Sequence, residues 1–151
     1  RALGKDLAAL RAPAHVFQCR GHEFVIAELA FARFLEDAPD VQAFAKNYLA
    51  VGFRLDYVKA DGDLSTYTPD FLVRDSDGAV WIIETKGREE LDIPQKMKRL
   101  KQWCEDATTA EAEDGGMGVR YDFLYVDQDG FEKHGPKTLA DLVASFTEYK
   151  S

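Results

Sequence analysis

Two short apolar segments near the middle of the chain are separated by a polar turn signal. They cover residues 68–74 and 79–86, and the intervening residues 75–78 end in the Asp-Gly pair typical of tight hairpins. Because successive side chains alternate between the faces of a strand, Glu84 and Lys86 lie on one face of the second segment. A hairpin that turns at 75–78 brings Asp70 opposite the end of that segment. The pattern therefore predicts a β-hairpin whose open end gathers Asp70, Glu84 and Lys86.

Apolar residues at helical spacing predict two long helices and a short one. The first covers residues 22–37, the second begins at Asp92 or Ile93 with Pro94 in its first turn, and the last follows Thr138. Asp141, three residues after Thr138, completes a capping box for the last helix. A further helical pattern lies near the beginning and is ended by Pro13. We interpret residues 1–20 as a linker or docking helix from a preceding domain.

The remaining segments complete the expected architecture. We expect a short helix or extended turn at 41–45, strands at 51–59, 120–127 and, after a turn at 128–130, at 131–134, and loops at 60–65, 87–91 and 111–118. The strand at 51–59 and the hairpin give a three-stranded antiparallel start. The strand at 120–127 follows a helix, so a crossover places it parallel to 79–86. Residues 21–151 are expected to form one α/β domain, a central mixed β-sheet flanked by helices.

The carboxylates at the open end of the hairpin suggest metal chemistry. Asp70 and Glu84 supply hard oxygen ligands that suit Mg²⁺, with Mn²⁺ as a substitute, and they leave room for water and a phosphate oxygen. Lys86 is placed to orient that water or to offset charge on the phosphate in the transition state. Paired charges at a solvated hairpin end are the alternative interpretation.

Pro69-Asp70 followed by Glu84-Thr85-Lys86 resembles the PD-(D/E)xK nuclease motif. The flanking residues 67–74 and 84–87, the upstream residues 44–47, and the spacing from Asp92 through Lys96 to Trp103 are similar to the endonuclease domain at the C-terminus of type III restriction enzyme subunits. The resemblance covers residues 24–146. It implies a restriction-endonuclease-like core and Mg²⁺-dependent cleavage of double-stranded DNA. It also implies a helicase or translocase domain in cis, and a methyltransferase subunit as a further partner.

The resemblance also assigns roles to individual residues. Thr85 would contribute its backbone carbonyl to the metal, and the helix before the hairpin would supply a further glutamate. Glu28 is the best match because it lies on the apolar stripe of that helix, with Glu23 and Glu36 as lesser candidates. A carboxylate on such a stripe must be paired, protonated or functional. The other interpretation is that Glu28 reaches solvent, because the helix is apolar on nearly every side.

Basic residues after the motif are the expected contact with DNA. This set comprises Arg88, Lys96, Lys98 and Arg99. A solvated helix face would have the same composition, and the resemblance favours Lys96 among them.

The net charge of −8 opposes a free-standing nonspecific DNA-binding protein, which is usually basic. The alternative function is therefore a non-catalytic module on a degenerate nuclease fold that binds nucleic acid or docks a partner. A small-molecule enzyme is disfavoured because the chain has no phosphate-binding glycine loop.

Location and redox state follow from what the sequence lacks. No apolar run reaches the ~18 residues of a membrane span and no secretory signal is visible, so no membrane partner is expected. Cys19 and Cys104 form neither a disulfide framework nor a metal spacing, which favours reduced thiols and a cytoplasmic protein. The histidines show no ligand spacing and are expected to be structural or exposed; they are His15, His22 and His134.

Overall fold

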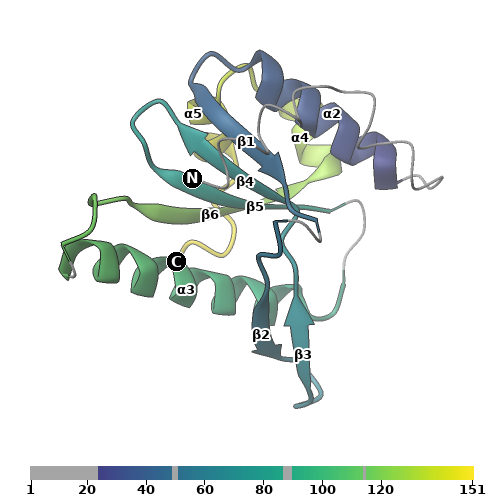
Figure 1. Cartoon of the computed structure of the whole chain (residues 1–151). Coiled ribbons are helices and arrows are strands. Elements are labelled where there is room, and N and C mark those ends of the chain that lie inside the picture. The colour runs from purple at the N-terminus through teal and green to yellow at the C-terminus, as the bar shows by residue number, and fades with distance from the viewer. Residues whose placement is uncertain (1–23, 49–50, 87–89, 114) are drawn as a thin grey trace.

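The computed structural model describes residues 24–48, 51–86, 90–113 and 115–151, which form a mixed α/β fold (Figure 1). The helices are α2 (Phe24–Asp37), α3 (Ile93–Glu113), α4 (Gln128–His134) and α5 (Leu139–Ser145). The strands are β1 (Val41–Lys46), β2 (Leu55–Val58), β3 (Leu64–Tyr67), β4 (Phe71–Asp75), β5 (Val80–Lys86) and β6 (Tyr121–Asp127). The predicted linker or docking helix at 1–20 lies outside the described residues.

The central sheet has the strand order β1-β4-β5-β6. Strand β4 runs antiparallel to both β1 and β5, and β6 pairs with β5 in parallel, from Val80 opposite Tyr121 to Lys86 opposite Asp127. The parallel pair requires a crossover, which α3 provides (Figure 1). The mixed sheet, the hairpin turn at 75–78 and the parallel placement of the last strand confirm the predictions from sequence.

Helices cover both faces of this sheet (Figure 1). On one face α3 packs against alternate residues of β4, β5 and β6, among them Leu72, Ile82 and Phe123. On the other face α2 and α5 pack with α4 on the intervening residues, among them Phe71, Ile83 and Leu124. The core is therefore divided by the sheet into two apolar layers, and the ends of β4 and β5 lie between them.

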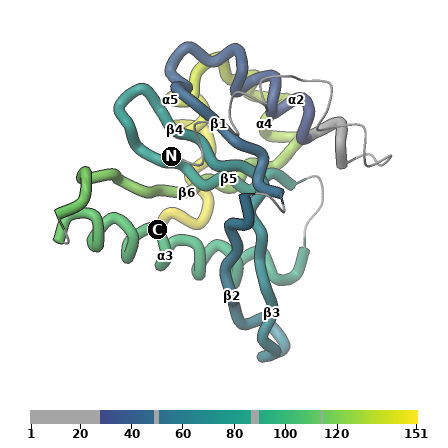
Figure 2. Tube along the Cα trace, in the orientation of Figure 1, coloured from purple at the N-terminus to yellow at the C-terminus, as the bar shows by residue number. Residues whose placement is uncertain are grey.

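Strands β2 and β3 form a separate antiparallel ribbon that crosses the first half of α3 (Figure 2). Tyr57 and Tyr67 are its buried aromatic residues. The predicted strand at 51–59 is shorter than expected, and part of the predicted loop at 60–65 belongs to β3. Alternation predicts that a segment is extended but not which strand it pairs with, so the expected three-stranded start was wrong.

The third antiparallel strand of the central sheet is β1, where the sequence predicted a short helix or extended turn. Its pairing with β4 is irregular between Val41 and Ala43. This irregularity breaks the alternation of buried and exposed side chains, because Phe44 and Ala45 are both buried. A strand with a broken period gives no strand signal in the sequence.

The segment after β6 is also different from the prediction. The expected turn at 128–130 and strand at 131–134 are instead the helix α4. Asp127 caps it by accepting a hydrogen bond from the Gly130 amide at 2.6 Å, and Gly135 ends it in the left-handed conformation with φ 51°. The prediction failed because Asp-Gly and a helix of two turns look like a turn in the sequence.

The long helices agree more closely with the sequence. Helix α2 ends at Asp37 and α3 begins at Ile93 as predicted, although α3 continues to Glu113, into the expected loop at 111–118. Thr138 caps α5 and accepts a hydrogen bond from the Asp141 amide at 3.0 Å. Within the described ranges, none of the helices has the length and apolar character needed to cross a bilayer.

Candidate functional site

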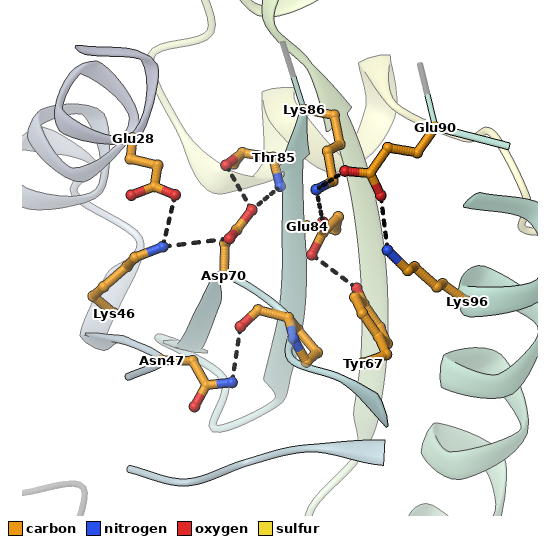
Figure 3. A network of polar contacts seen from close by, with 11 residues as sticks. Glu28, Lys46, Asn47, Tyr67, Asp70, Glu84, Thr85, Lys86, Glu90 and Lys96 are labelled. Atoms are coloured by element: carbon orange, nitrogen blue, oxygen red, sulfur yellow. Dashed lines mark hydrogen bonds and ion pairs between the residues drawn. The ribbon is translucent and has the colours of Figure 1, made fainter. Parts of the chain in front are cut away.

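The open end of the β4–β5 hairpin brings Asp70 to the last residues of β5 (Figure 3). Phe71 pairs with Ile83, so Asp70 is one residue beyond the last pair. Its Oδ2 accepts hydrogen bonds from the backbone N–H of Thr85 at 2.8 Å and from the Thr85 hydroxyl at 2.9 Å. Thr85 thus fixes the carboxylate of Asp70, a role additional to the carbonyl ligand that the resemblance implies.

Asn47 holds the chain that leads into Asp70. Its side chain is 5% exposed and donates from Nδ2 to the carbonyls of Phe53 at 2.6 Å and Pro69 at 2.8 Å. Its Oδ1 accepts from the Phe53 amide at 3.2 Å, and its own N–H donates to the Asp70 carbonyl at 2.7 Å. One buried amide therefore joins the residue after β1, the segment before β2 and the residues that position Asp70.

We expect Asn47→Ala to lower the free energy of unfolding by about 2–4 kcal/mol, because it leaves the buried Pro69 carbonyl and the partly buried backbone groups of Phe53 without a partner. Urea unfolding monitored by circular dichroism measures this loss. Gln102→Ala, an exposed change on α3, is the control and should cost less than about 0.5 kcal/mol. An equal effect of the two substitutions would show that the Asn47 side chain is not a structural clamp.

Glu84 is a buried carboxylate, with 2% of its surface exposed. Its Oε2 accepts a hydrogen bond from the Tyr67 hydroxyl at 2.9 Å, and its Oε1 lies 3.0 Å from the ammonium of Lys86. Burial, followed by the negative charge of Asp70, raises the pKa of Glu84 from 4.5 to about 7, although Lys86 and Tyr67 act in the opposite direction. The ionised form of Glu84 is therefore under-compensated, and a further positive charge beside it would be favourable.

Lys86 lies between Glu84 and Glu90, which is 3.1 Å from its ammonium (Figure 3). Burial lowers the pKa of Lys86, but the two glutamates outweigh burial and leave the pKa above the ordinary value. Lys86 is consequently a fixed cation at neutral pH. It can orient a water molecule or stabilise negative charge, but it cannot take up a proton as a general base.

Glu28 faces the site through Lys46. The ammonium of Lys46 is 3.0 Å from Glu28 and 3.3 Å from Asp70. Glu28 therefore belongs to the polar network of the site rather than to bulk solvent, and a lysine separates it from Asp70. Of the lesser candidates, Glu36 is exposed near the end of α2 and Glu23 lies outside the described residues.

The basic residues of the predicted DNA contact do not all gather here. Lys96 joins the network, because its ammonium is 2.8 Å from Glu90. Lys98 is exposed on α3, and Arg99 donates from Nε to the Asp56 carbonyl at 3.1 Å, on the β2–β3 ribbon. Arg88 lies outside the described residues.

Four residues of this network (Figure 3) were not predicted as site residues, namely Lys46, Asn47, Tyr67 and Glu90. Lys46 and Tyr67 occur within the segments that carry the resemblance, but nothing in their spacing indicates contact with Asp70 or Glu84. Glu90 is four residues after Lys86, and this spacing is informative only within a helix. Their roles depend on contacts between β1, β3, β5 and the segment before α3, which only the fold provides.

The donor set fits one divalent cation in its chemistry. The oxygen ligands available are the carboxylates of Asp70 and Glu84 and the Thr85 carbonyl, which is the set that Mg²⁺ prefers when water completes the shell. In the described part of the chain, no three histidine, cysteine, aspartate or glutamate side chains form a group that could hold a metal. A cation here would therefore be bound by the carboxylates of Asp70 and Glu84 only. The third nearby carboxylate, that of Glu28, is separated from Asp70 by Lys46.

The cysteine and histidine that the structure describes lie away from the site. Burial raises the pKa of the Cys104 thiol to about 12, so it is a protonated core residue of α3. The ring of His134 packs against Phe146 with 5.9 Å between the ring centroids. Neither residue joins the polar network, whereas Cys19, His15 and His22 lie outside the described residues.

Comparison of the chain with protein-family models, with curated proteins and with solved structures gave no match. Any functional assignment therefore depends on the chemistry of the hairpin end. That chemistry is a buried carboxylate beside a second carboxylate, a fixed ammonium directly after them, and further lysines at the rim of the site.

Proposed function

We propose that this chain is a Mg²⁺-dependent endonuclease domain of the PD-(D/E)xK type, which hydrolyses phosphodiester bonds of double-stranded DNA. The observation that carries the proposal is the buried Glu84, whose charge is under-compensated beside Asp70 at the open end of the hairpin. Carboxylates whose pKa is raised by burial and by a neighbouring charge are concentrated at functional sites. Binding a divalent cation is the use that the neighbouring Asp70 favours.

The strand order supports a restriction-endonuclease-like core. A hairpin that carries the carboxylates lies in the middle of the sheet, and a helix crosses over from β5 to the parallel strand β6. Helices cover both faces (Figure 1), and Asp70, Thr85 and Lys86 at the open end of the hairpin are each partly exposed to solvent. Such a position suits a site that a DNA duplex approaches from the edge of the sheet.

Each residue has a separate role in the proposed reaction. Asp70 and Glu84 would hold Mg²⁺ together with the Thr85 carbonyl, and the metal supplies a Lewis acid for the phosphate and for its bound water. Tyr67 and Lys86 keep Glu84 in one orientation. Lys86 directs a water molecule at the phosphorus and stabilises the negative charge that develops on the phosphate oxygens.

Lys46 favours a single metal ion over two. Its ammonium lies within 3.3 Å of both Glu28 and Asp70, where a second cation would otherwise be placed. Glu28 would then act by holding Lys46 rather than as a metal ligand. This interpretation replaces the direct metal contact that the sequence suggested for Glu28.

The acidic charge of the chain bears on its partners. A net charge of −8 gives weak attraction to DNA, so a helicase or translocase domain in the same protein would supply most phosphate contacts. A methyltransferase subunit is the further partner of restriction enzymes that this kind of domain implies. Both partners rest on the sequence resemblance.

The alternative is a non-catalytic module that binds nucleic acid or docks a partner. The ion pairs favour it in one respect, because Lys46 and Lys86 already contact the two carboxylates. Metal-dependent chemistry distinguishes the two functions, since a docking module has no use for a divalent cation.

The test is cleavage of supercoiled plasmid by the full-length protein with Mg²⁺ or Mn²⁺, and with EDTA. We expect nicked or linear DNA with either metal, and none with EDTA or with Asp70→Asn. Asp77→Asn removes the same charge at the opposite, exposed end of the same hairpin and should cleave at the rate of the wild type. Cleavage that survives Asp70→Asn would place the chemistry elsewhere, and no cleavage by the wild type would favour the docking module.

A further inference from the structure

Glu90 bridges two lysines at the rim of the site (Figure 3). One carboxylate oxygen lies 3.1 Å from the Lys86 ammonium, and the other lies 2.8 Å from the Lys96 ammonium. The hydrogen bond from Lys96, together with Lys86, lowers the pKa of Glu90, so its carboxylate is ionised at neutral pH. A single anionic group with two oxygens thus holds two cations that come from different elements, β5 and α3.

The two lysines are positioned without Glu90. Lys86 also contacts the buried Glu84 at 3.0 Å. The Lys96 ammonium lies over the rings of Tyr57 and Tyr67, at 5.8 and 5.6 Å from their centroids. Cation–π contacts with two rings favour this position of the ammonium whether or not an anion is bound.

The two lysines are more buried than Glu90, which indicates that Glu90 can be exchanged for another anion. The side chains of Lys86 and Lys96 are each 15% exposed, whereas that of Glu90 is 44% exposed. An exposed ion pair contributes little to stability, so Glu90 can leave for solvent at small cost. The two ammonium groups are mostly enclosed and keep their positions, so an anion that replaces Glu90 meets both of them.

We propose that Lys86 and Lys96 form a two-point site for one backbone phosphate of DNA, and that Glu90 occupies this site until DNA enters. The inference rests on the proposed function and deepens it. A phosphodiester presents two non-bridging oxygens about as far apart as those of a carboxylate, with the same charge of −1. Exchange of Glu90 for the phosphate therefore keeps both contacts and the local charge balance, and it places the phosphate next to Glu84 and Asp70.

This arrangement makes Glu90 a competitor of the substrate. It would lower the affinity for DNA that lacks other strong contacts, and it would exclude small anions from the lysines. Phosphate entry would free Lys86 from Glu90 but not from Glu84, so the lysine would remain held at the site during exchange.

The experiment measures the binding of a fluorescein-labelled DNA duplex to the full-length protein by anisotropy, in EDTA and at low salt. We expect Glu90→Gln to tighten binding about 3- to 10-fold, because an amide competes poorly for two ammonium groups. Glu105→Gln, an exposed change on α3 that removes the same charge, is the control and should change the affinity less than about 2-fold.

A second variant tests whether the gain acts through Lys96. When Lys96 is already replaced by glutamine, Glu90→Gln should increase the affinity for DNA by less than a third of the increase that it gives in the wild-type protein. The reason is that one of the two phosphate contacts is already lost. Equal effects of Glu90→Gln and Glu105→Gln, or a full gain without Lys96, would overturn the inference. So would a wild type and a Glu90→Gln variant that both fail to bind DNA.

These outcomes are separable from a failure of the proposed function. Metal-dependent cleavage that depends on Asp70, with no special effect of Glu90→Gln, would refute the phosphate site and leave the endonuclease intact. A specific gain in DNA binding with Glu90→Gln, without cleavage under any metal, would support the phosphate site in a non-catalytic module.

Discussion

Lys86→Met should lower the rate of metal-dependent DNA cleavage by about 10³-fold while the domain stays folded. The Lys86 ammonium is held 3.0 Å from Glu84, directly beside the carboxylates that would bind the metal. Removal of a single preorganised group that stabilises charge in the transition state typically costs about 10²- to 10³-fold in rate. Single-turnover cleavage at saturating protein measures the chemical step separately from DNA binding.

The fold tolerates this substitution because Glu84 can take up a proton. Its pKa is already about 7, and loss of the neighbouring cation raises the pKa further, so the buried carboxylate becomes neutral instead of remaining unpaired. Lys137→Met, an exposed change before α5, removes the same charge and is the control. Lys86→Met that cleaves at the rate of this control would exclude Lys86 from the chemistry.

The candidate carboxylates could be predicted from the sequence because the hairpin carries its own local signals. The Asp-Gly turn at 77–78 fixes where the chain reverses, and reversal there places Asp70 at the end of β5 in either likely register. Once the strand is known, alternation places Glu84 and Lys86 on one face. The turn residues and the alternation of side chains along β5 are therefore sufficient to predict this part of the site.

The elements that surround the hairpin depended on information that is not local. Strand β1 is recognised as a strand only through its pairing with β4, since its irregularity at Val41–Ala43 hides the period. The β2–β3 ribbon was missed for a related reason, because the pattern of a strand does not show which other strand it pairs with. The prediction of one sheet was therefore too simple, although a mixed central sheet flanked by helices was predicted correctly.

The rest of the polar network also depended on these pairings. Lys46 reaches Asp70 because β1 lies beside β4, and Tyr67 reaches Glu84 because the ribbon leads into the hairpin. In the sequence these residues are 24 and 17 positions from their partners. Charge and hydrogen-bonding capacity alone do not select them among the many polar residues of the chain.

Glu84→Gln should increase the stability of the metal-free protein above neutral pH while it removes metal binding. The folded protein raises the pKa of Glu84 from 4.5 to about 7. Between these values the folded state binds the proton more tightly than the unfolded state, so the contribution of Glu84 to stability falls as the pH rises. A shift of this size corresponds to about 3 kcal/mol at pH 8, reduced by the contact with Lys86 that glutamine loses.

The measurement is urea unfolding in EDTA from pH 5 to pH 8, with Glu36→Gln as an exposed control. The difference in unfolding free energy between Glu84→Gln and the wild type should increase by about 2 kcal/mol from pH 5 to pH 8. The difference between Glu36→Gln and the wild type should stay constant over the same range. A difference that does not change with pH would show that Glu84 is not a strained ionised group.

The wild type and Glu84→Gln also test why the protein keeps a buried carboxylate that lowers its stability above neutral pH. Ca²⁺ should raise the melting temperature of the wild type at pH 8, because a cation bound to the folded state offsets the buried charge of Glu84 and adds binding free energy. It should not raise that of Glu84→Gln, which has lost one of two carboxylate ligands. If Glu84→Gln is more stable than the wild type without metal, and its melting temperature does not change with Ca²⁺, then Glu84 is retained for metal binding at the expense of stability. Equal stabilisation of both proteins by Ca²⁺ would place the cation elsewhere and leave Glu84 without the proposed role.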